Sequence, residues 1–343
     1  FIMKRFNYMF FLYLMIIISF SSNISSDSSK LIKNLKIERG FSIEIFAENI
    51  ETPRQIAESD SGNIFVGSRS GGTITAISSN KDIRVIAKGL SNSTGVTFHD
   101  GDLYFSEVNS IWKIPNIDEA LSSSEQMPDK VLVTNNLPSD TWHGWKWIDF
   151  GPDNKLYVPV GAPCNICNPS LEEKYNFDKR YASIMRLNDG KWEYVARGVR
   201  NTVGFDWHPK TNNLYFGDNG RDWMGDDMPS CELNVVKNDD SFYGYPYKHS
   251  MDVLDPDYSK KIPDNAEEFI DPILELGAHV APTGLSFYAG DHFPAKYKNT
   301  LFMTLHGSWN RSRKVGYKVI AVHFDENGEL LYHKDFITGW LQK

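Results

Sequence analysis

Short apolar runs separated by turn-forming residues recur along most of the chain. A unit of four such runs occurs five times in the same order, and the runs are rich in Val, Ile, Tyr and Phe, which favour β-strands. The first runs lie at residues 55–57, 95–98, 147–150, 203–207 and 284–287. The second runs lie at residues 64–66, 103–105, 156–158, 214–216 and 301–303.

The third runs alternate between apolar and polar residues, as half-buried strands do. They lie at residues 73–77, 111–114, 184–187, 233–236 and 319–322. Fourth runs, such as 83–86, 131–133 and 193–195, precede a turn into the next unit. A four-stranded unit in fixed order predicts an all-β propeller with four-stranded blades, because a sandwich gives no reason for one unit to recur.

The two ends of the repeat predict how many blades there are. Residues 41–46 alternate and precede the first complete unit, so we expect an isolated fourth strand that closes the last blade. The sequence stops at Lys343, shortly after the fourth run of the fifth unit near Phe336. We therefore expect a six-bladed propeller over residues 41–343, truncated at its C-terminus, whose last blade is incomplete.

The first 26 residues have the pattern of a secretory signal peptide. Lys4 and Arg5 precede an apolar stretch at residues 9–20, and small polar residues follow it. The alternative is an uncleaved N-terminal anchor. With either interpretation, residues 27–40 would be a linker. Export predicts a periplasmic or extracellular location.

Charge and cysteine content narrow the possible partners. The formal net charge is -8 and no dense Lys/Arg tract occurs, which argues against nucleic acid and favours a small polar ligand. Membrane contact is expected only through an uncleaved N-terminal segment. The cysteines are Cys164, Cys167 and Cys231, too few for the usual four-ligand zinc site. We expect a Cys164–Cys167 disulfide with Cys231 free, as suits an oxidising compartment.

Unusual polar residues collect in two kinds of loop that open on the same face of such a unit. One kind enters a first strand, at residues 141–145, 198–202 and 279–283. The other joins a second to a third strand, at residues 161–167, 217–222 and 306–311. We call these six segments the mouth loops. They predict a polar ligand site at the mouth of the central channel, the usual location of a site in a propeller.

Each candidate residue also has a purely structural interpretation. His143 lies between Trp142 and Trp145 and could be a packed histidine that hydrogen-bonds to the backbone. Arg200 and Asn201 could form a turn with an ion pair. The acidic residues at 218–227 could be a solvated loop, or they could hold calcium through carboxylates and carbonyls.

At these loops the sequence resembles the glucose/sorbosone dehydrogenase family, the soluble aldose sugar dehydrogenases, and above all its sorbosone-dehydrogenase-like branch. The resemblance runs from about residue 41 to the end. It is carried by residues 143–145 with 150–153, 161–165, 200–201 with 204–209, 218–222 with 225–227, and 306–311. It implies a six-bladed propeller that binds pyrroloquinoline quinone (PQQ) and calcium.

The resemblance also implies a role for each matching residue. His143 would be the general base that takes the substrate hydroxyl proton while hydride passes to the quinone. Arg200 would stabilise negative charge on the quinone oxygens, with Asn201 as a neutral donor. The remaining roles are calcium binding by the backbone carbonyls of Gly220 and Arg221, and binding of the cofactor's carboxylates by His279, His306 and Arg311.

Two departures from the family pattern matter. Ala162 stands where soluble glucose dehydrogenases have Asp, so a carboxylate partner of His143 would have to come from elsewhere and glucose is not the favoured substrate. An Arg-Pro segment that lines the family's site would lie in the strands expected to be missing.

The predicted function is oxidation of a sugar or sugar-derived alcohol or aldehyde, with a cytochrome or a quinone as electron acceptor. Two alternatives stay open: a calcium-dependent lactone hydrolase, and a non-catalytic propeller that binds a protein or glycan. A lactonase site would need inward Glu, Asn and Asp side chains, whereas the mouth loops offer His and Arg.

Overall fold

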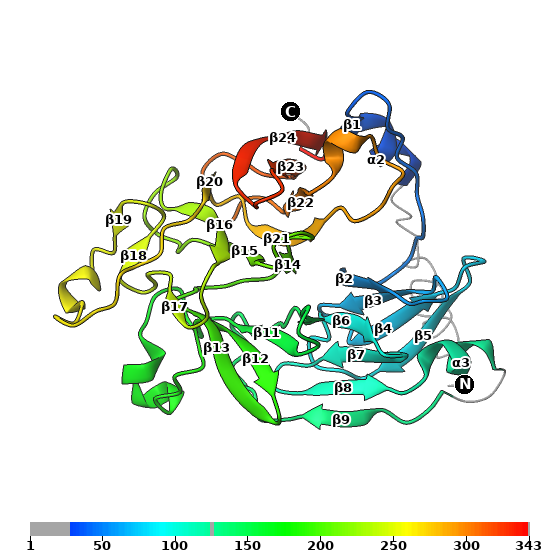
Figure 1. The fold of residues 1–343 in the computed structure, drawn as a ribbon, viewed down its shortest axis with the longest axis horizontal. Coiled ribbons are helices and arrows are strands. Elements are labelled where there is room, and N and C mark those ends of the chain that lie inside the picture. Colours follow the sequence, from blue (N-terminus) through cyan, green and yellow to red (C-terminus); the bar gives the residue numbers. More distant parts are fainter. Residues whose placement is uncertain (1–27, 124–126, 342–343) are drawn as a thin grey trace, which may run out of the picture.

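A computed structural model describes residues 28–123 and 127–341 of the chain. Within these residues, five antiparallel sheets are arranged around a common centre, with the first strand of each sheet innermost and the fourth near the rim (Figure 1). The first sheet contains β2 (Pro53–Glu58), β3 (Ile64–Ser68), β4 (Thr73–Ile77) and β5 (Ile83–Lys88). The second contains β6 (Val96–His99), β7 (Asp102–Ser106), β8 (Ile111–Ile114) and β9 (Val131–Thr134). The all-β propeller class is confirmed.

The third and fourth sheets follow the same order but are joined by an unpredicted excursion. The third contains β10 (Asp149–Phe150), β11 (Leu156–Val160), β12 (Ser183–Asn188) and β13 (Lys191–Arg197). The fourth contains β14 (Phe205–Trp207), β15 (Leu214–Asp218), β16 (Ser230–Val236) and β20 (Leu274–Ala278). Between β16 and β20 the chain forms β17 (Ser241–Phe242), β18 (Lys248–His249) and β19 (Val253–Leu254). β17 pairs in parallel with β13, so the excursion ties the fourth sheet to the third.

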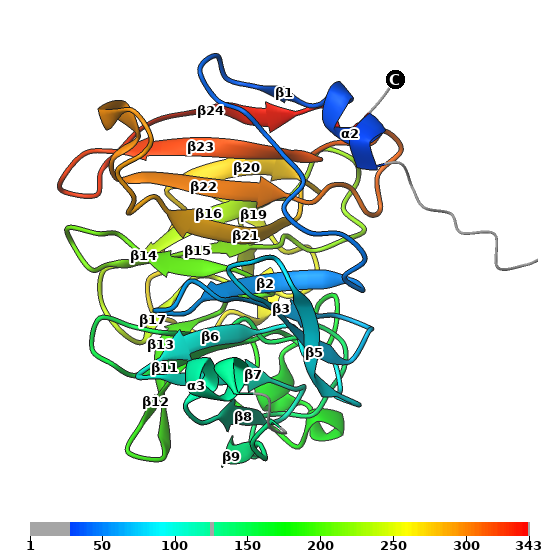
Figure 2. The ribbon, with the colours of Figure 1, turned by 90° about the vertical axis from the view of Figure 1, so that its right-hand side faces the viewer.

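The fifth sheet takes up a strand from the N-terminal part of the chain. It contains β21 (Pro282–Phe287), β22 (Thr300–Leu305), β23 (Lys318–Phe324) and β24 (Leu330–Thr338). β1 (Lys36–Ile37) pairs with the outer edge of β24, as Figure 2 shows. The chain then runs from this edge past the space between the fifth and first sheets to β2 (Figure 1).

The predicted sixth blade is wrong for the described residues, which form five blades. Residues 41–46 are not a strand, although they alternate, because no neighbouring strand pairs with them. Instead, the Phe41 ring packs edge-on against Phe293, Tyr297 and Phe336 at centroid distances of 4.8, 5.2 and 5.0 Å. Burial of the Phe41 ring against the fifth sheet therefore fixes this segment.

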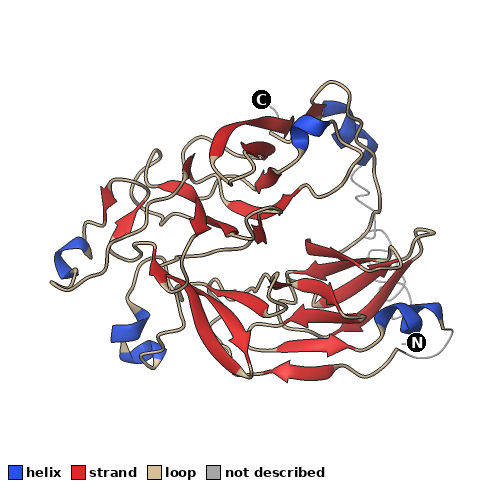
Figure 3. Cartoon of the chain, viewed as in Figure 1, coloured by secondary structure: helices blue, strands red, loops and turns tan. Residues whose placement is uncertain are grey.

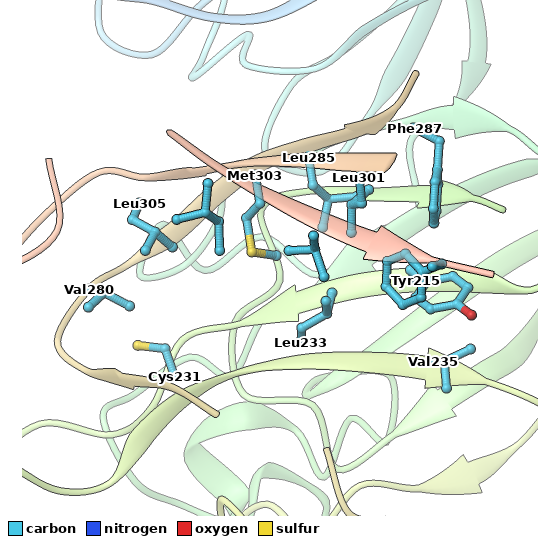
Figure 4. Packing of buried hydrophobic residues seen from close by; sticks show 13 residues of the cluster. Tyr215, Cys231, Leu233, Val235, Val280, Leu285, Phe287, Leu301, Met303 and Leu305 are labelled. Atoms are coloured by element: carbon cyan, nitrogen blue, oxygen red, sulfur yellow. The ribbon is translucent and has the colours of Figure 1, made fainter. Parts of the chain in front are cut away.

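Apolar side chains from facing sheets pack between the blades. Figure 4 shows the cluster between the fourth and fifth sheets, where Tyr215 and Leu233 meet Leu285, Leu301 and Met303. All five are at most 5 % exposed. Because successive strand residues point to opposite faces, each inner strand contributes to the packing on both of its sides. This packing fixes the positions from which the mouth loops start.

Helices are short and peripheral (Figure 3). They are α2 (Ser28–Asn34), α3 (Ile117–Ser122), η1 (Pro169–Leu171), η2 (Glu173–Tyr175), η3 (Ser259–Lys261) and η4 (Ala295–Tyr297). Among residues 28–123 and 127–341, no helix has the length and apolar character needed to cross a membrane. The predicted signal peptide, residues 1–26, lies outside the described residues, whereas the predicted linker includes α2 and β1.

Candidate functional site

The structure brings His143 against the loop that follows β11. Its Nδ1 atom lies 2.8 Å from the carbonyl oxygen of Ala162. A carbonyl only accepts hydrogen bonds, so Nδ1 carries the hydrogen and Nε2 keeps its lone pair. The partner that orients His143 is thus a backbone carbonyl, and not the carboxylate that the resemblance implies.

The environment of His143 keeps its imidazole neutral. Burial lowers the pKa of His143 well below its ordinary value, and the nearby positive charges of Arg200 and Lys146 lower it further. The hydrogen bond to Ala162 opposes this shift only in part. A neutral imidazole with a free Nε2 can accept a proton, which is the property that a general base requires.

Arg200 is buried and its guanidinium is held by carbonyl and amide oxygens. Nε donates to the Asn165 carbonyl at 2.9 Å, and Nη2 donates to Asn165 Oδ1 at 2.9 Å. Nη1 donates to the Asn219 carbonyl at 3.0 Å. The Asp222 carboxylate lies 3.6 Å from Nη2. Asp222 therefore provides a counter-charge for Arg200, and the hydrogen bonds fix the orientation of the guanidinium.

Asn165 connects two mouth loops, a role that sequence reasoning missed. Besides holding Arg200, its Oδ1 accepts from the backbone N–H of Asp222 at 2.8 Å, and its Nδ2 donates to the Asp222 carbonyl at 3.1 Å. Asn165 lies inside the loop closed by the Cys164–Cys167 disulfide, which confirms the predicted pairing, with Cys231 free and buried. The sequence signal for this role of Asn165 was its position between Cys164 and Cys167.

The backbone of Arg200 and Asn201 is anchored on a buried carboxylate. Asp218 accepts from the backbone N–H of Arg200 at 2.8 Å and from that of Asn201 at 2.6 Å. Burial raises the pKa of Asp218 to about 6, against the opposing effect of these N–H groups and of the Arg200 charge. Asn201 Oδ1 is buried beside Gly161 and has no partner among the described residues, so it is open to a ligand.

His279 and Arg311 both contact the loop that continues from Asp222. His279 Nε2 bonds to the Gly225 carbonyl at 2.8 Å. Arg311 donates to the Asp226 carbonyl and to Asp227 Oδ1, the latter at 2.9 Å. These contacts shape the loop, and the role of His279 and Arg311 in binding cofactor carboxylates stays a prediction.

His306 differs from the other candidates because its side chain is exposed. Partial burial lowers its pKa, and so do the positive charges of Arg54 and Arg69 from the first sheet. Neither arginine was singled out from the sequence. The structure thus adds Arg54 and Arg69 to the basic residues at the mouth, next to His306.

The Gly220–Arg221 segment offers carbonyls, and no side chains, to a cation. The Arg221 side chain forms a buried ion pair with Asp255, which also bonds His249 Nε2 at 2.9 Å. Within the described part of the chain, neither carbonyl of Gly220 and Arg221 accepts a backbone hydrogen bond. Among those same residues, no group of three or more His, Cys, Asp or Glu side chains could hold a metal.

Lys146 is a buried cation beneath His143 that sequence reasoning also missed. Its Nζ donates to the Gly144 carbonyl at 2.7 Å, and the side chain is only 2 % exposed. Burial lowers the pKa of Lys146 to about 7. The amine therefore stabilises the turn that carries His143 through its hydrogen bond to Gly144, although burial destabilises its charged form.

These features fit an anionic, planar cofactor such as PQQ, which carries three carboxylates and a quinone. The mouth holds the guanidinium of Arg200, and Asn201 Oδ1 offers an acceptor to an N–H or hydroxyl donor of a ligand. Arg311 Nε is also buried without a partner among the described residues. Buried polar atoms without partners are rare in folded proteins and frequently mark the place of a missing ion or ligand.

Known proteins resemble this chain in sequence and in fold. A Borreliella burgdorferi protein, itself uncharacterised, is 37% identical over 333 residues, covering 94% of this chain and 85% of that protein. The holo form of the pyranose dehydrogenase PQQ domain from Coprinopsis cinerea superposes with a TM-score of 0.70 at 18% identity, covering 90% of this chain and 87% of that one.

A calcium structure of the Trichoderma reesei carbohydrate-active enzyme of family AA12 has a TM-score of 0.71 at 20% identity, covering 89% of this chain and 87% of that one. The sequence model of the TrAA12-like family matches residues 35–336. This range includes all five sheets except the last two residues of β24, and all six mouth loops. The resemblance to PQQ-dependent sugar dehydrogenases is confirmed, and the chain belongs to the TrAA12-like family.

Proposed function

We propose that the chain is a PQQ-dependent dehydrogenase that oxidises a hydroxyl or aldehyde group of a sugar, with hydride transfer to the quinone. The observation that carries this proposal is the state of His143. Its Nδ1–H is fixed on the Ala162 carbonyl, its Nε2 is free, and its pKa is lowered. The Coprinopsis cinerea and Trichoderma reesei proteins support the choice of cofactor and substrate class.

His143 would accept the proton of the reacting hydroxyl at Nε2. Loss of that proton makes the C–H hydrogen of the same carbon easier to remove with its electron pair, and PQQ supplies the two-electron oxidant when bound. The imidazolium that forms lies near Arg200, and this like charge favours prompt release of the proton. The substrate carbon thereby gains a C=O bond, and its proton leaves through His143.

Arg200 would bind the developing negative charge, and Asn201 would supply a neutral contact beside it. Arg200 is 4 % exposed, so its charge acts in a medium of low polarity, where electrostatic stabilisation is strong. Its fixed hydrogen bonds to Asn165 and Asn219 mean that little reorganisation is required. Calcium would be held by the carbonyls of Gly220 and Arg221.

We also propose that the protein is exported and that an external electron acceptor re-oxidises its cofactor. The Cys164–Cys167 disulfide supports an oxidising, periplasmic or extracellular location. A cytochrome or a quinone would then re-oxidise the cofactor. Loss of the Asp that soluble glucose dehydrogenases have at the position of Ala162 supports a sugar other than glucose.

The test is reconstitution of the purified chain with PQQ and calcium chloride. Bleaching of dichlorophenolindophenol is then followed with aldopyranoses, ketoses and sugar aldehydes as substrates. Turnover that requires PQQ and falls by roughly two to four orders of magnitude in His143→Ala is expected. Cofactor binding without turnover of any sugar in the panel would overturn the assignment.

A further inference from the structure

Two arginines of the first sheet lie side by side at the mouth. β2 and β3 pair so that Pro53 is opposite Ser68, and the backbone N–H of Arg69 donates to the Thr52 carbonyl at 3.0 Å. Arg69 follows Ser68 directly, and Arg54 follows Pro53 in the irregular stretch before the next pair, Ile56 and Val66. Residue 69 follows the second strand of its unit, so it opens on the same face as the mouth loops.

Within residues 28–123 and 127–341, neither guanidinium group forms an ion pair with a carboxylate. The neighbouring carboxylate, Glu51, packs beside Gly71 and pairs with neither arginine. Burial lowers the pKa of Arg54, and the charge of Arg69 lowers it further, so the two cations lie close enough to repel each other.

Most of their hydrogen-bond donors are unused. Arg54 Nη1 donates to the carbonyl of Pro53 at 2.7 Å, and the Arg69 guanidinium stacks over the Trp145 ring at 4.2 Å. A guanidinium has five N–H donors in a planar fork, and a stacked fork keeps its edge free. Trp145 is two residues from His143, which places the Arg69 charge close to the candidate site.

His306 approaches the same pair from the fifth sheet. It follows β22 directly, and the charges of Arg54 and Arg69 both act on it. The pair therefore has the third sheet on one side, through Trp145, and the fifth sheet on the other. In a chain of net charge -8, such an uncompensated cationic group attracts small anions.

We propose that Arg54 and Arg69 form a carboxylate-binding site at the mouth, with His306 on its far side. Paired forks match the geometry of carboxylates, and desolvation strengthens the contact. The carboxylate would belong either to the cofactor or to an acidic sugar, and this identification rests on the proposed function.

The test compares Arg54→Gln/Arg69→Gln with Arg84→Gln, which removes an exposed arginine on β5. Binding of PQQ to the cofactor-free chain is measured by fluorescence titration, and binding of citrate by the shift in melting temperature. The double variant should lose the citrate-induced shift, and it should bind either PQQ or an acidic sugar about 10–100-fold more weakly, as expected for lost charge-assisted hydrogen bonds. Arg84→Gln should match the wild type.

The outcomes distinguish a carboxylate of the cofactor from that of an acidic sugar. They also distinguish failure of the arginine site from failure of the proposed function. Weaker PQQ binding with unchanged KM for a neutral sugar identifies the cofactor as the source. Unchanged PQQ binding with a raised KM for glucuronate identifies an acidic sugar. Equal binding of PQQ, citrate and glucuronate by the double variant and the wild type would overturn the site. A wild-type chain that binds citrate through the arginines but does not bind PQQ would leave the site standing and remove the proposed function.

Discussion

Gly161 and His143 are in such close contact that a Cβ atom on Gly161 would lie 2.7 Å from the Cβ atom of His143. The same added atom would lie 3.2 Å from Asn201 Oδ1. Only glycine therefore allows the loop after β11 to meet both candidate residues. The approach also brings the Ala162 carbonyl to Nδ1 of His143.

Gly161→Ala should displace His143 while leaving the propeller folded. A displacement of about 1 Å at a catalytic group can reduce turnover by about 100-fold, and we expect a loss of that size in kcat with PQQ still bound. The matched control is Gly284→Ala, whose added methyl group would meet nothing nearer than 3.3 Å. Wild-type kcat in Gly161→Ala would show that the contact does not position His143.

The pH profile of kcat/KM reports the protonation of His143. Because burial and Arg200 lower its pKa well below 6.5, the free enzyme keeps His143 neutral at pH 6.5. We expect kcat/KM for a neutral sugar to stay constant as the pH falls from 8 to 6.5, and to decrease only at lower pH. A profile with its acidic midpoint at or above 6.5 would contradict this account.

Asn165→Ala should release Arg200, because it removes the Oδ1 acceptor at 2.9 Å and the tie to Asp222. We expect PQQ affinity and kcat to fall by about 10–100-fold, the effect of a charge-assisted hydrogen bond. Asn168→Ala is the control, because Asn168 bonds Tyr247 in the same region without contacting Arg200. Equal losses in the two variants would assign Asn165 a purely structural role.

Lys146→Met should stabilise the protein, and more so at low pH. The folded-state pKa of about 7 lies below the ordinary lysine value of 10.5, so the unfolded chain binds the extra proton between these values. Stability of the wild type therefore rises with pH across this window. We expect the stability advantage of the variant to be about 3 kcal/mol larger at pH 6 than at pH 9.

Urea unfolding at both pH values measures the Lys146 effect, with exposed Lys191→Met as the control. If the advantage of Lys146→Met is the same at pH 6 and pH 9, the buried amine does not titrate as described.

Local pattern predicted the strands whose partners are adjacent in sequence. Residues 301–303 and 319–322 are short apolar runs and lie in β22 and β23, which pair directly. The same reasoning failed at residues 41–46, because alternation does not reveal whether a partner strand exists. It also missed β20, whose pairing with β16 spans the excursion at residues 237–273.

The sequence likewise predicted some residues of the candidate site and missed others. His143, Arg200 and Asn201 were found because their place in the repeated unit puts them on one face. Asn165, Arg54 and Arg69 were not, because their importance depends on contacts between segments far apart in the sequence: the hydrogen bonds of Asn165 to Arg200, and the stacking of Arg69 on Trp145. Lys146 was missed because the local sequence does not show that its side chain is buried. Such contacts depend on how the sheets pack, which local pattern does not contain.

The most direct test of the account is a single turnover without an electron acceptor. The chain is loaded with PQQ and calcium, mixed anaerobically with excess pyranose, and followed by the absorbance of the oxidised quinone. We predict loss of that absorbance in the wild type, and a rate roughly 100- to 10,000-fold lower in His143→Ala with the cofactor still bound. An unchanged rate in His143→Ala, or no reaction of the loaded wild type with any pyranose, would contradict the account.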